Sequence, residues 1–141
     1  MIKYGNEENR MNIAEGQLDG IGVKQDTKKA ISILTDLAKS GSEDAARKLG
    51  YLYSWGEYNV QDKVIGFEFR LMAASREDAA PLSCYQVGCD YLYGDGVAEG
   101  ETEALRWFKK AYSQVKDHGH YLSPGAFEHI EDLLFSDNDH L

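Results

Sequence analysis

The sequence has no apolar run long enough to cross a bilayer, only two cysteines and a shortage of basic residues. A transmembrane helix needs about 20 consecutive apolar residues, and no segment approaches that length. The opening residues, MIKYGNEENRMN, include acidic side chains and no apolar core, so they do not resemble a secretory signal. We therefore expect a cytoplasmic protein with no membrane partner.

Positive charge is scarce, because 15 Lys and Arg oppose 24 Asp and Glu, for a formal net charge of −9. Such a surface repels phosphate backbones, which argues against nucleic-acid binding. It would attract a basic or mixed-charge protein partner, although the simpler explanation is that the acidity serves only solubility. The length of 141 residues and the 43% of hydrophobic residues indicate a single domain over residues 1–141. We expect a monomer or weak dimer.

The two cysteines, Cys84 and Cys89, stand five residues apart on a predicted helix. At that spacing their side chains diverge, and the two Cα atoms lie too far apart for a comfortable disulfide. The sequence therefore predicts free thiols, which are typical of a reducing compartment.

Three segments of the chain repeat one pattern of small, apolar and acidic residues. The offset is 36 residues from the first copy to the second and 38 from the second to the third. All landmarks keep these offsets, so the two extra residues belong to the connection around 75–80. The equivalent positions are Ile13 and Ala14, Leu49 and Gly50, Val87 and Gly88; Gly20, Gly56 and Gly94; Asp26, Asp62 and Gly100; Ala30, Gly66 and Ala104; Ile33, Phe69 and Trp107; and Leu37, Ala73 and Ala111.

Each copy predicts two amphipathic helices that meet at a glycine-rich corner, at 20–23, 56–59 or 94–97. Apolar residues recur at steps of three and four, which is typical of helices with one buried face. We assign Leu82 to that face. The expected helices cover about 9–19, 27–39, 43–55, 63–75, a segment from 81 to the third corner, and 101–116, with Asp26, Ser42 and Asp62 as N-caps.

A final helix is expected from Ser123 and Pro124 to about Phe135, outside the repeats. It would cover the open end of the stack, as a terminal repeat requires. The predicted fold is an all-α solenoid of three helix pairs plus this capping helix. Its repeats cover about 9–41, 42–77 and 80–116.

The third copy has the best-preserved motif, and the others depart from it in places. The first copy has Gln17 where the third has Tyr91, and the second has Tyr58 and Gly66 for Gly96 and Ala104. The motif of the third copy comprises Val87, Gly88, Tyr91, Gly94, Gly96, Val97, Ala104, Trp107 and Ala111. This pattern resembles the Sel-one-like repeat family, over about residues 9–115. The resemblance implies a right-handed superhelix that binds other proteins rather than a catalyst, with Tyr53 and Tyr91 in the core.

Residues with catalytic or metal-binding chemistry are few. His118 and His120 flank Gly119, but no third and fourth ligand stands at ordinary spacing. Ser123 is better explained as a helix cap than as a nucleophile, and the GxSxG, Walker and HExxH motifs are absent from the sequence. We expect no catalytic residue, no metal site and no cofactor.

The non-consensus aromatics are the strongest candidates for partner binding. Trp55 and Tyr93 stand two residues after the consensus tyrosines, on helices expected to line the concave groove. Exposed Trp and Tyr are enriched in binding hot spots, although the rings could instead pack between neighbouring repeats. The predicted partner-binding residues are Asn12, Glu15, Asp19, Lys48, Tyr51, Trp55, Gln86, Asp90, Tyr93 and Asp95.

Small size, acidity and the lack of catalytic groups favour a bacterial immunity or antitoxin-like protein that occludes a toxin. The alternative is an adaptor or scaffold in a signalling or envelope complex. A hydrolase is the remote alternative, since it would require a polar cluster in the groove that the sequence does not reveal.

Overall fold

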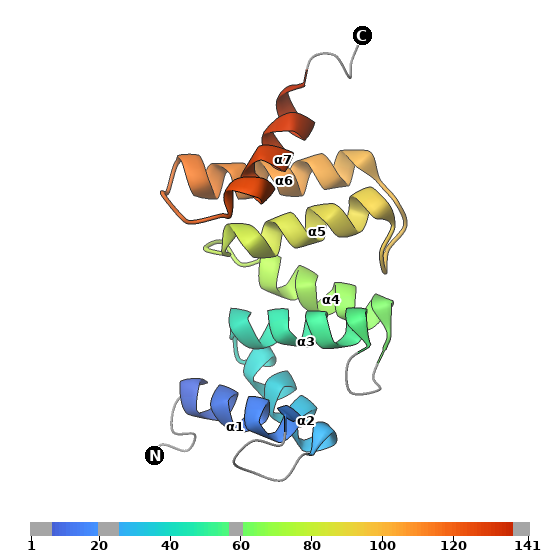
Figure 1. Ribbon diagram of the computed structural model, residues 1–141, viewed down its shortest axis with the longest axis vertical. Coiled ribbons are helices and arrows are strands. Elements are labelled where there is room, and N and C mark those ends of the chain that lie inside the picture. The colour runs from blue at the N-terminus through green and yellow to red at the C-terminus, as the bar shows by residue number, and fades with distance from the viewer. Residues whose placement is uncertain (1–6, 20–25, 57–60, 137–141) are drawn as a thin grey trace. The chain divides into compact units, whose positions relative to one another are not determined.

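The computed structural model describes residues 7–19, 26–56 and 61–136, and the regular structure in those ranges is entirely helical (Figure 1). The all-α fold class is confirmed. The expected helix boundaries agree with the structure to within two residues, since the first helix begins at Glu7 and the fourth ends at Ala74. The helices are α1 (Glu7–Asp19), α2 (Thr27–Lys39), α3 (Glu43–Trp55), α4 (Lys63–Ala74), α5 (Pro81–Tyr93), α6 (Glu101–Lys116) and α7 (Pro124–Phe135).

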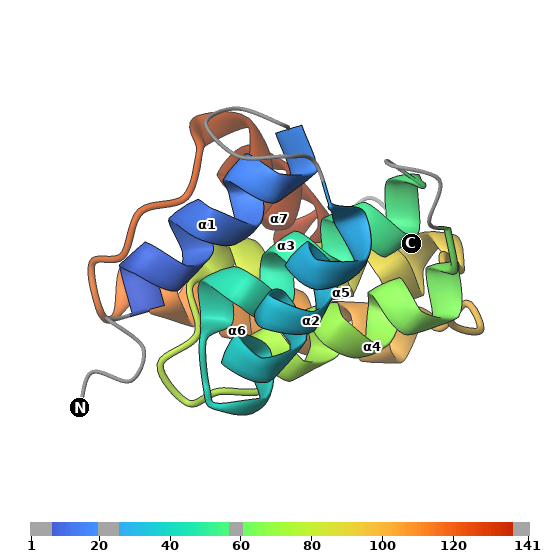
Figure 2. The same cartoon turned by 90° about the horizontal axis from the view of Figure 1, so that it is seen from below.

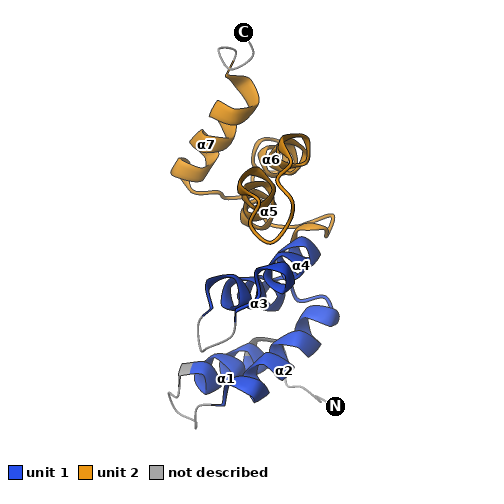
Figure 3. Cartoon of the chain, turned by 90° about the vertical axis from the view of Figure 1, so that its right-hand side faces the viewer, with its two compact units in different colours: residues 1–73 blue, residues 74–141 orange. Residues whose placement is uncertain are grey.

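The chain forms two compact units, residues 1–73 and residues 74–141 (Figure 3). The first unit holds the first two helix pairs, and the second holds the third pair with α7. The boundary falls at the end of α4, next to the connection that carries the two extra residues of the repeat pattern. The length and hydrophobic content of the chain, from which a single domain was expected, do not indicate this division.

The helix caps agree with the sequence. The backbone N–H of Lys29 donates to Asp26 Oδ1 at 3.1 Å, and that of Ala45 donates to Ser42 Oγ at 3.1 Å. Asp62 caps α4 by accepting from two backbone N–H groups, and Ser123 caps α7. These bonds satisfy N–H groups that have no partner within their own helix.

One backbone hydrogen bond recurs at every corner between paired helices. The N–H of the residue before the second helix donates to a carbonyl of the first helix nine residues earlier. The bonds join Asp26 to Gln17 at 2.8 Å, Asp62 to Tyr53 at 2.9 Å and Gly100 to Tyr91 at 2.9 Å. Because the acceptor is a backbone carbonyl, Gln17 serves as well as the consensus tyrosine.

Glycines close two of the first helices. Gly56 ends α3 with φ of 73° and Gly94 ends α5 with φ of 69°, in the left-handed region that favours glycine. The corner at 20–23 and residues 57–59 of the second corner lie outside the described residues.

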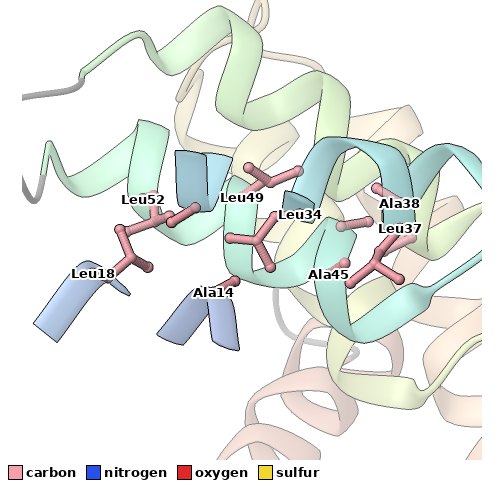
Figure 4. Close-up of a cluster of buried hydrophobic side chains, with 11 residues drawn as sticks. Ala14, Leu18, Leu34, Leu37, Ala38, Ala45, Leu49 and Leu52 are labelled. Atoms are coloured by element: carbon pink, nitrogen blue, oxygen red, sulfur yellow. The ribbon is translucent and has the colours of Figure 1, made fainter. Parts of the chain in front are cut away.

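The core of the first unit is built from leucines and alanines of α1, α2 and α3. Helix α2 lies against both α1 and α3 (Figures 1 and 2). Leu34 of α2 points between Ala14 of α1 and Leu49 of α3, and Leu18 lies beside Leu52 (Figure 4). Burying such side chains contributes about 1.5–3 kcal/mol each and stabilises the stack.

The core of the second unit lies between α5, α6 and α7. Val87 of α5, Phe108 of α6 and Ile130 of α7 are fully buried. Helix α6 also holds the connection that follows α4, since Lys110 Nζ donates to the carbonyls of Ala74 at 2.6 Å and Arg76 at 2.8 Å. Apolar contacts between the three helices and polar contacts with the preceding connection therefore both stabilise this unit.

Small residues allow the paired helices to approach closely. A Cβ added at Gly66 of α4 would lie 3.0 Å from the Ser54 backbone nitrogen and 3.1 Å from the Gly50 carbonyl of α3. A Cβ added at Gly88 of α5 would lie 2.5 Å from the Phe108 ring of α6. Both glycines stand at positions that the repeat pattern marks as small.

One residue assigned to the buried face is exposed, since Leu82 exposes 42% of its surface. That assignment was wrong because it followed apolar character rather than repeat register. Met72 of α4 is also exposed, at 40%. Met72 is equivalent to Asp36, and Leu82 to Asp44, and both aspartates are exposed. The consensus Tyr53 and Tyr91 are partly buried, which agrees with their placement at the core.

We predict opposite effects on stability for two glycine-to-alanine changes. Gly88→Ala should lower the free energy of unfolding by about 1–3 kcal/mol, because the buried Phe108 ring cannot move aside. Gly125→Ala should raise it by about 0.5–1 kcal/mol, since a Cβ there meets nothing within 4 Å and the unfolded chain loses freedom. Urea unfolding measures the change in unfolding free energy for both variants. Equal changes for the two variants would refute the close approach of Gly88 to the Phe108 ring.

Candidate partner-binding surfaces

The first unit carries an exposed ladder on one face of α3, formed by Lys48, Tyr51 and Trp55. Steps of three and four residues place successive side chains on one helical face. Tyr51 exposes 44% and Trp55 exposes 68% of their surface. Their ring centroids lie 6.2 Å apart, and Lys48 Nζ lies 5.9 Å from the Tyr51 centroid. The structure therefore brings these three predicted residues together.

Arg47, next to the ladder, is engaged within its own helix. Its guanidinium pairs with Glu43 at 3.2 Å and with Asp44 at 2.5 Å. These pairs hold the arginine towards the start of α3. The cation beside the aromatic rings is therefore Lys48.

The predicted binding residues of α1 differ from one another in exposure. Asn12 is exposed and Glu15 is partly buried. Asp19 is the last residue of α1, but its side chain lies outside the described part of the structure. The helix contributes no exposed aromatic ring at these positions, since Asp19 stands where α3 has Trp55.

The second unit presents Tyr93 at the end of α5, with 67% of its surface exposed. Gln86 and Asp95 are partly buried. Asp90 exposes only 3% of its surface, so it offers no surface to a partner, contrary to its place among the predicted partner-binding residues. It occupies the repeat position of Leu52, which is fully buried in the second copy.

The structure also exposes aromatic residues that were not among the predicted binding residues. Tyr121, in the loop before α7, exposes 81% of its surface, and Phe135, at the end of α7, exposes 56%. The Phe135 ring lies 5.1 Å from that of Tyr112, so one side of it is packed. The sequence could have indicated Tyr121, because it lies in a polar loop between helices.

A polar contact that the sequence did not reveal ties α7 to α5. The Tyr85 hydroxyl and His129 Nδ1 lie 2.8 Å apart and are hydrogen-bonded, and the two rings also meet edge to face. Burial of the hydroxyl, followed by the neighbouring Cys89, raises the pKa of Tyr85 to about 12. The tyrosine therefore stays protonated at all ordinary pH values.

The described residues hold little that could support catalysis or metal binding. Within residues 7–19, 26–56 and 61–136, no three His, Cys, Asp or Glu side chains gather closely enough to hold a metal ion. The His118 and His120 rings lie 6.1 Å apart. Cys84 and Cys89 are free thiols, as expected from their spacing. None of the described helices combines the length and apolar character that spanning a membrane demands.

The family model of the Sel1 repeat matches the chain three times, over residues 11–42, 43–78 and 81–115. The chain belongs to the Sel1 repeat family. The matched segments agree with the repeats expected from the sequence to within about two residues, so the resemblance and the solenoid class are confirmed. Helix α7 lies outside the matched repeats.

Solved structures share the fold of this Sel1 repeat chain. A Sel1 repeat protein from Oxalobacter formigenes is 26% identical with a TM-score of 0.73, and the match covers 92% of this chain and 91% of that one. A protective antigen of uropathogenic Escherichia coli is 17% identical with a TM-score of 0.69, over 97% of this chain and 32% of its own length. Cysteine-rich protein B of Helicobacter pylori is 22% identical with a TM-score of 0.62, over 86% and 89% of the two chains.

Sel1 repeat proteins generally mediate protein–protein interaction, and their fold is typically a scaffold rather than an enzyme. The comparison with curated proteins returned no match. The family therefore supports the general role of binding a protein.

We predict that Tyr85→Phe will remove a pH-dependent part of the stability. The pKa of Tyr85 is about 12 in the folded protein and 10.0 as its ordinary value. The raised pKa means that the contribution of Tyr85 is fully present below pH 10 and is lost as the pH rises towards 12. The difference in unfolding free energy between wild type and Tyr85→Phe should therefore shrink over that range.

Chemical denaturation at several pH values measures this difference. Tyr121→Phe is the control, because the Tyr121 side chain is exposed in a loop. A wild-type advantage over Tyr85→Phe that does not change between pH 9 and pH 12 would contradict a partly buried, hydrogen-bonded hydroxyl.

Proposed function

We propose that this Sel1 repeat protein binds a protein partner through exposed aromatic side chains on the first helices of its repeats. The observation that carries the proposal is the exposure of Trp55 and Tyr93. They occupy the same repeat position, 38 residues apart, and expose 68% and 67% of their surface. Neither is a consensus residue of the repeat, so the fold does not require either ring.

The physical chemistry of these rings suits partner binding. Trp and Tyr bury a large area with few rotatable bonds, which keeps the entropy cost of ordering them low. On α3 the contact between the Tyr51 and Trp55 rings orders both before a partner arrives. Repeat landmarks such as Gly50 and Gly66 hold the helix behind them rigidly.

The more specific role that we propose is that of a bacterial immunity or antitoxin-like protein which occludes a basic or mixed-charge toxin. The net charge of −9 supports a basic partner. The free thiols of Cys84 and Cys89 are consistent with the reducing cytoplasm as its location. In this role the protein acts as a monomer or weak dimer and leaves its aromatic faces open to the toxin.

We predict that Trp55→Ala will weaken partner binding by about tenfold or more, because hot-spot aromatics contribute roughly 2 kcal/mol or more. The products of genes adjacent to this one are the candidates to purify. Each is mixed with the full chain, and titration calorimetry measures Kd for wild type and variant. Tyr121→Ala is the matched control, since it removes an exposed ring from a loop and should leave Kd unchanged.

The activity of the captured partner separates the two candidate roles. Loss of a toxic activity on binding supports the immunity role, whereas retained activity indicates an adaptor or scaffold. If none of the adjacent gene products forms a stable complex, the immunity proposal falls. If Trp55→Ala and Tyr121→Ala behave alike in a genuine complex, the aromatic faces do not bind the partner.

A further inference from the structure

The acidity of the protein is concentrated in one of its two units. Residues 1–73 contain 11 Asp and Glu and 10 Lys and Arg, for a net charge of −1. Residues 74–141 contain 13 Asp and Glu and 5 Lys and Arg, for a net charge of −8. Electrostatic attraction of a basic partner therefore belongs almost entirely to the second unit.

Tyr93 and its neighbours lie at the end of α5 within that acidic unit. Gly94, with φ of 69°, turns the chain directly after the ring. A Cβ at Gly94 would lie 3.5 Å from the Cβ of Glu99, so the base of the glutamate lies beside the residue that follows Tyr93. Glu99 and Glu101 are both exposed. An exposed aromatic ring and two carboxylates therefore share this end of the helix pair.

The side-chain chemistry of this face fits arginine. A guanidinium group stacks on an aromatic ring while its N–H groups donate to carboxylates beside the ring. Lysine pairs with the same carboxylates as a compact, strongly hydrated point charge and stacks less well. The ring supplies a contact that salt does not screen, and the carboxylates supply a long-range attraction that salt does screen.

We propose that the Tyr93 face, formed by Tyr93, Glu99 and Glu101, binds an arginine-containing segment of the protein partner. The ladder of Lys48, Tyr51 and Trp55 on α3 takes no part in this recognition, because its unit is close to neutral and the nearest cation to its rings is its own Lys48. The two aromatic faces share a repeat position and have different ligand chemistry. This inference rests on the proposed protein-binding function and gives one of its surfaces a specific ligand.

The experiment uses the full chain and a labelled peptide of alternating glycine and arginine. Fluorescence anisotropy measures Kd, and backbone NMR shifts locate the peptide. Tyr93→Ala should weaken binding by about three- to fivefold, the range expected for an exposed cation–π contact. Tyr93→Phe, which keeps the ring, should retain the wild-type Kd. A citrulline peptide, which keeps the shape and lacks the charge, should bind at least about tenfold more weakly.

Two matched controls separate local recognition from general attraction to an acidic protein. Tyr121→Ala removes an exposed ring from a loop elsewhere in the acidic unit and should leave the peptide Kd unchanged. Glu99→Gln with Glu101→Gln should weaken binding about fivefold and reduce its salt dependence. Glu128→Gln with Glu131→Gln removes the same charge from α7 and should change Kd less than about twofold.

The proposal is overturned if the peptide does not bind, if Tyr121→Ala weakens binding as much as Tyr93→Ala, or if both glutamate pairs have the same effect. It is also overturned if the NMR shifts do not centre on residues 93–101. These results would leave the proposed function intact as long as a partner complex still depends on Trp55. Conversely, peptide binding at Tyr93 without any partner complex would remove the proposed immunity role and retain the arginine site.

Discussion

The backbone hydrogen bond that closes each corner is the interaction on which the rest of the structure depends. It joins the N–H before each second helix to a carbonyl nine residues earlier, at 2.8–2.9 Å in all three pairs. Because the bond sets where the second helix starts, it places Gly66 against Gly50 in α3 and α4. It uses only backbone atoms, so the corner residues can vary as long as the chain can turn. The first copy keeps the bond although Gln17 replaces the tyrosine.

Close packing of the helix pairs involves only the inner faces of the first helices, so their outer faces can carry residues that bind a partner. The inner faces are closed by apolar and small residues, and at Gly50, Gly66 and Gly88 an added Cβ would crowd the facing helix. Large rings that do not fit this core, such as Trp55 and Tyr93, project from the ends of α3 and α5. A repeat protein can therefore vary its partner by changing these positions without disturbing its core.

The two units share the helix-pair repeat and differ in their surfaces. In the first, Lys48 lies beside the rings of the ladder and the net charge is close to zero. In the second, the exposed Glu99 and Glu101 stand in the connection after Tyr93 and at the start of α6, and α7 is held to α5 by the hydrogen bond between Tyr85 and His129. Contacts with aromatic side chains slow the dissociation of a partner, whereas charge speeds its association. The two units therefore offer a partner different kinds of contact.

The sequence by itself determined the seven helices, their caps, the repeat register and the non-consensus status of Trp55 and Tyr93. These features follow from local patterns: helical periodicity, capping residues, glycine corners and departures from the consensus. The tertiary structure decided the burial of Asp90, the exposure of Leu82 and Met72, the link between Tyr85 and His129, and the division at residue 74. Each of these depends on which side chain another helix brings against the residue, and the spacing within a single helix does not contain that information.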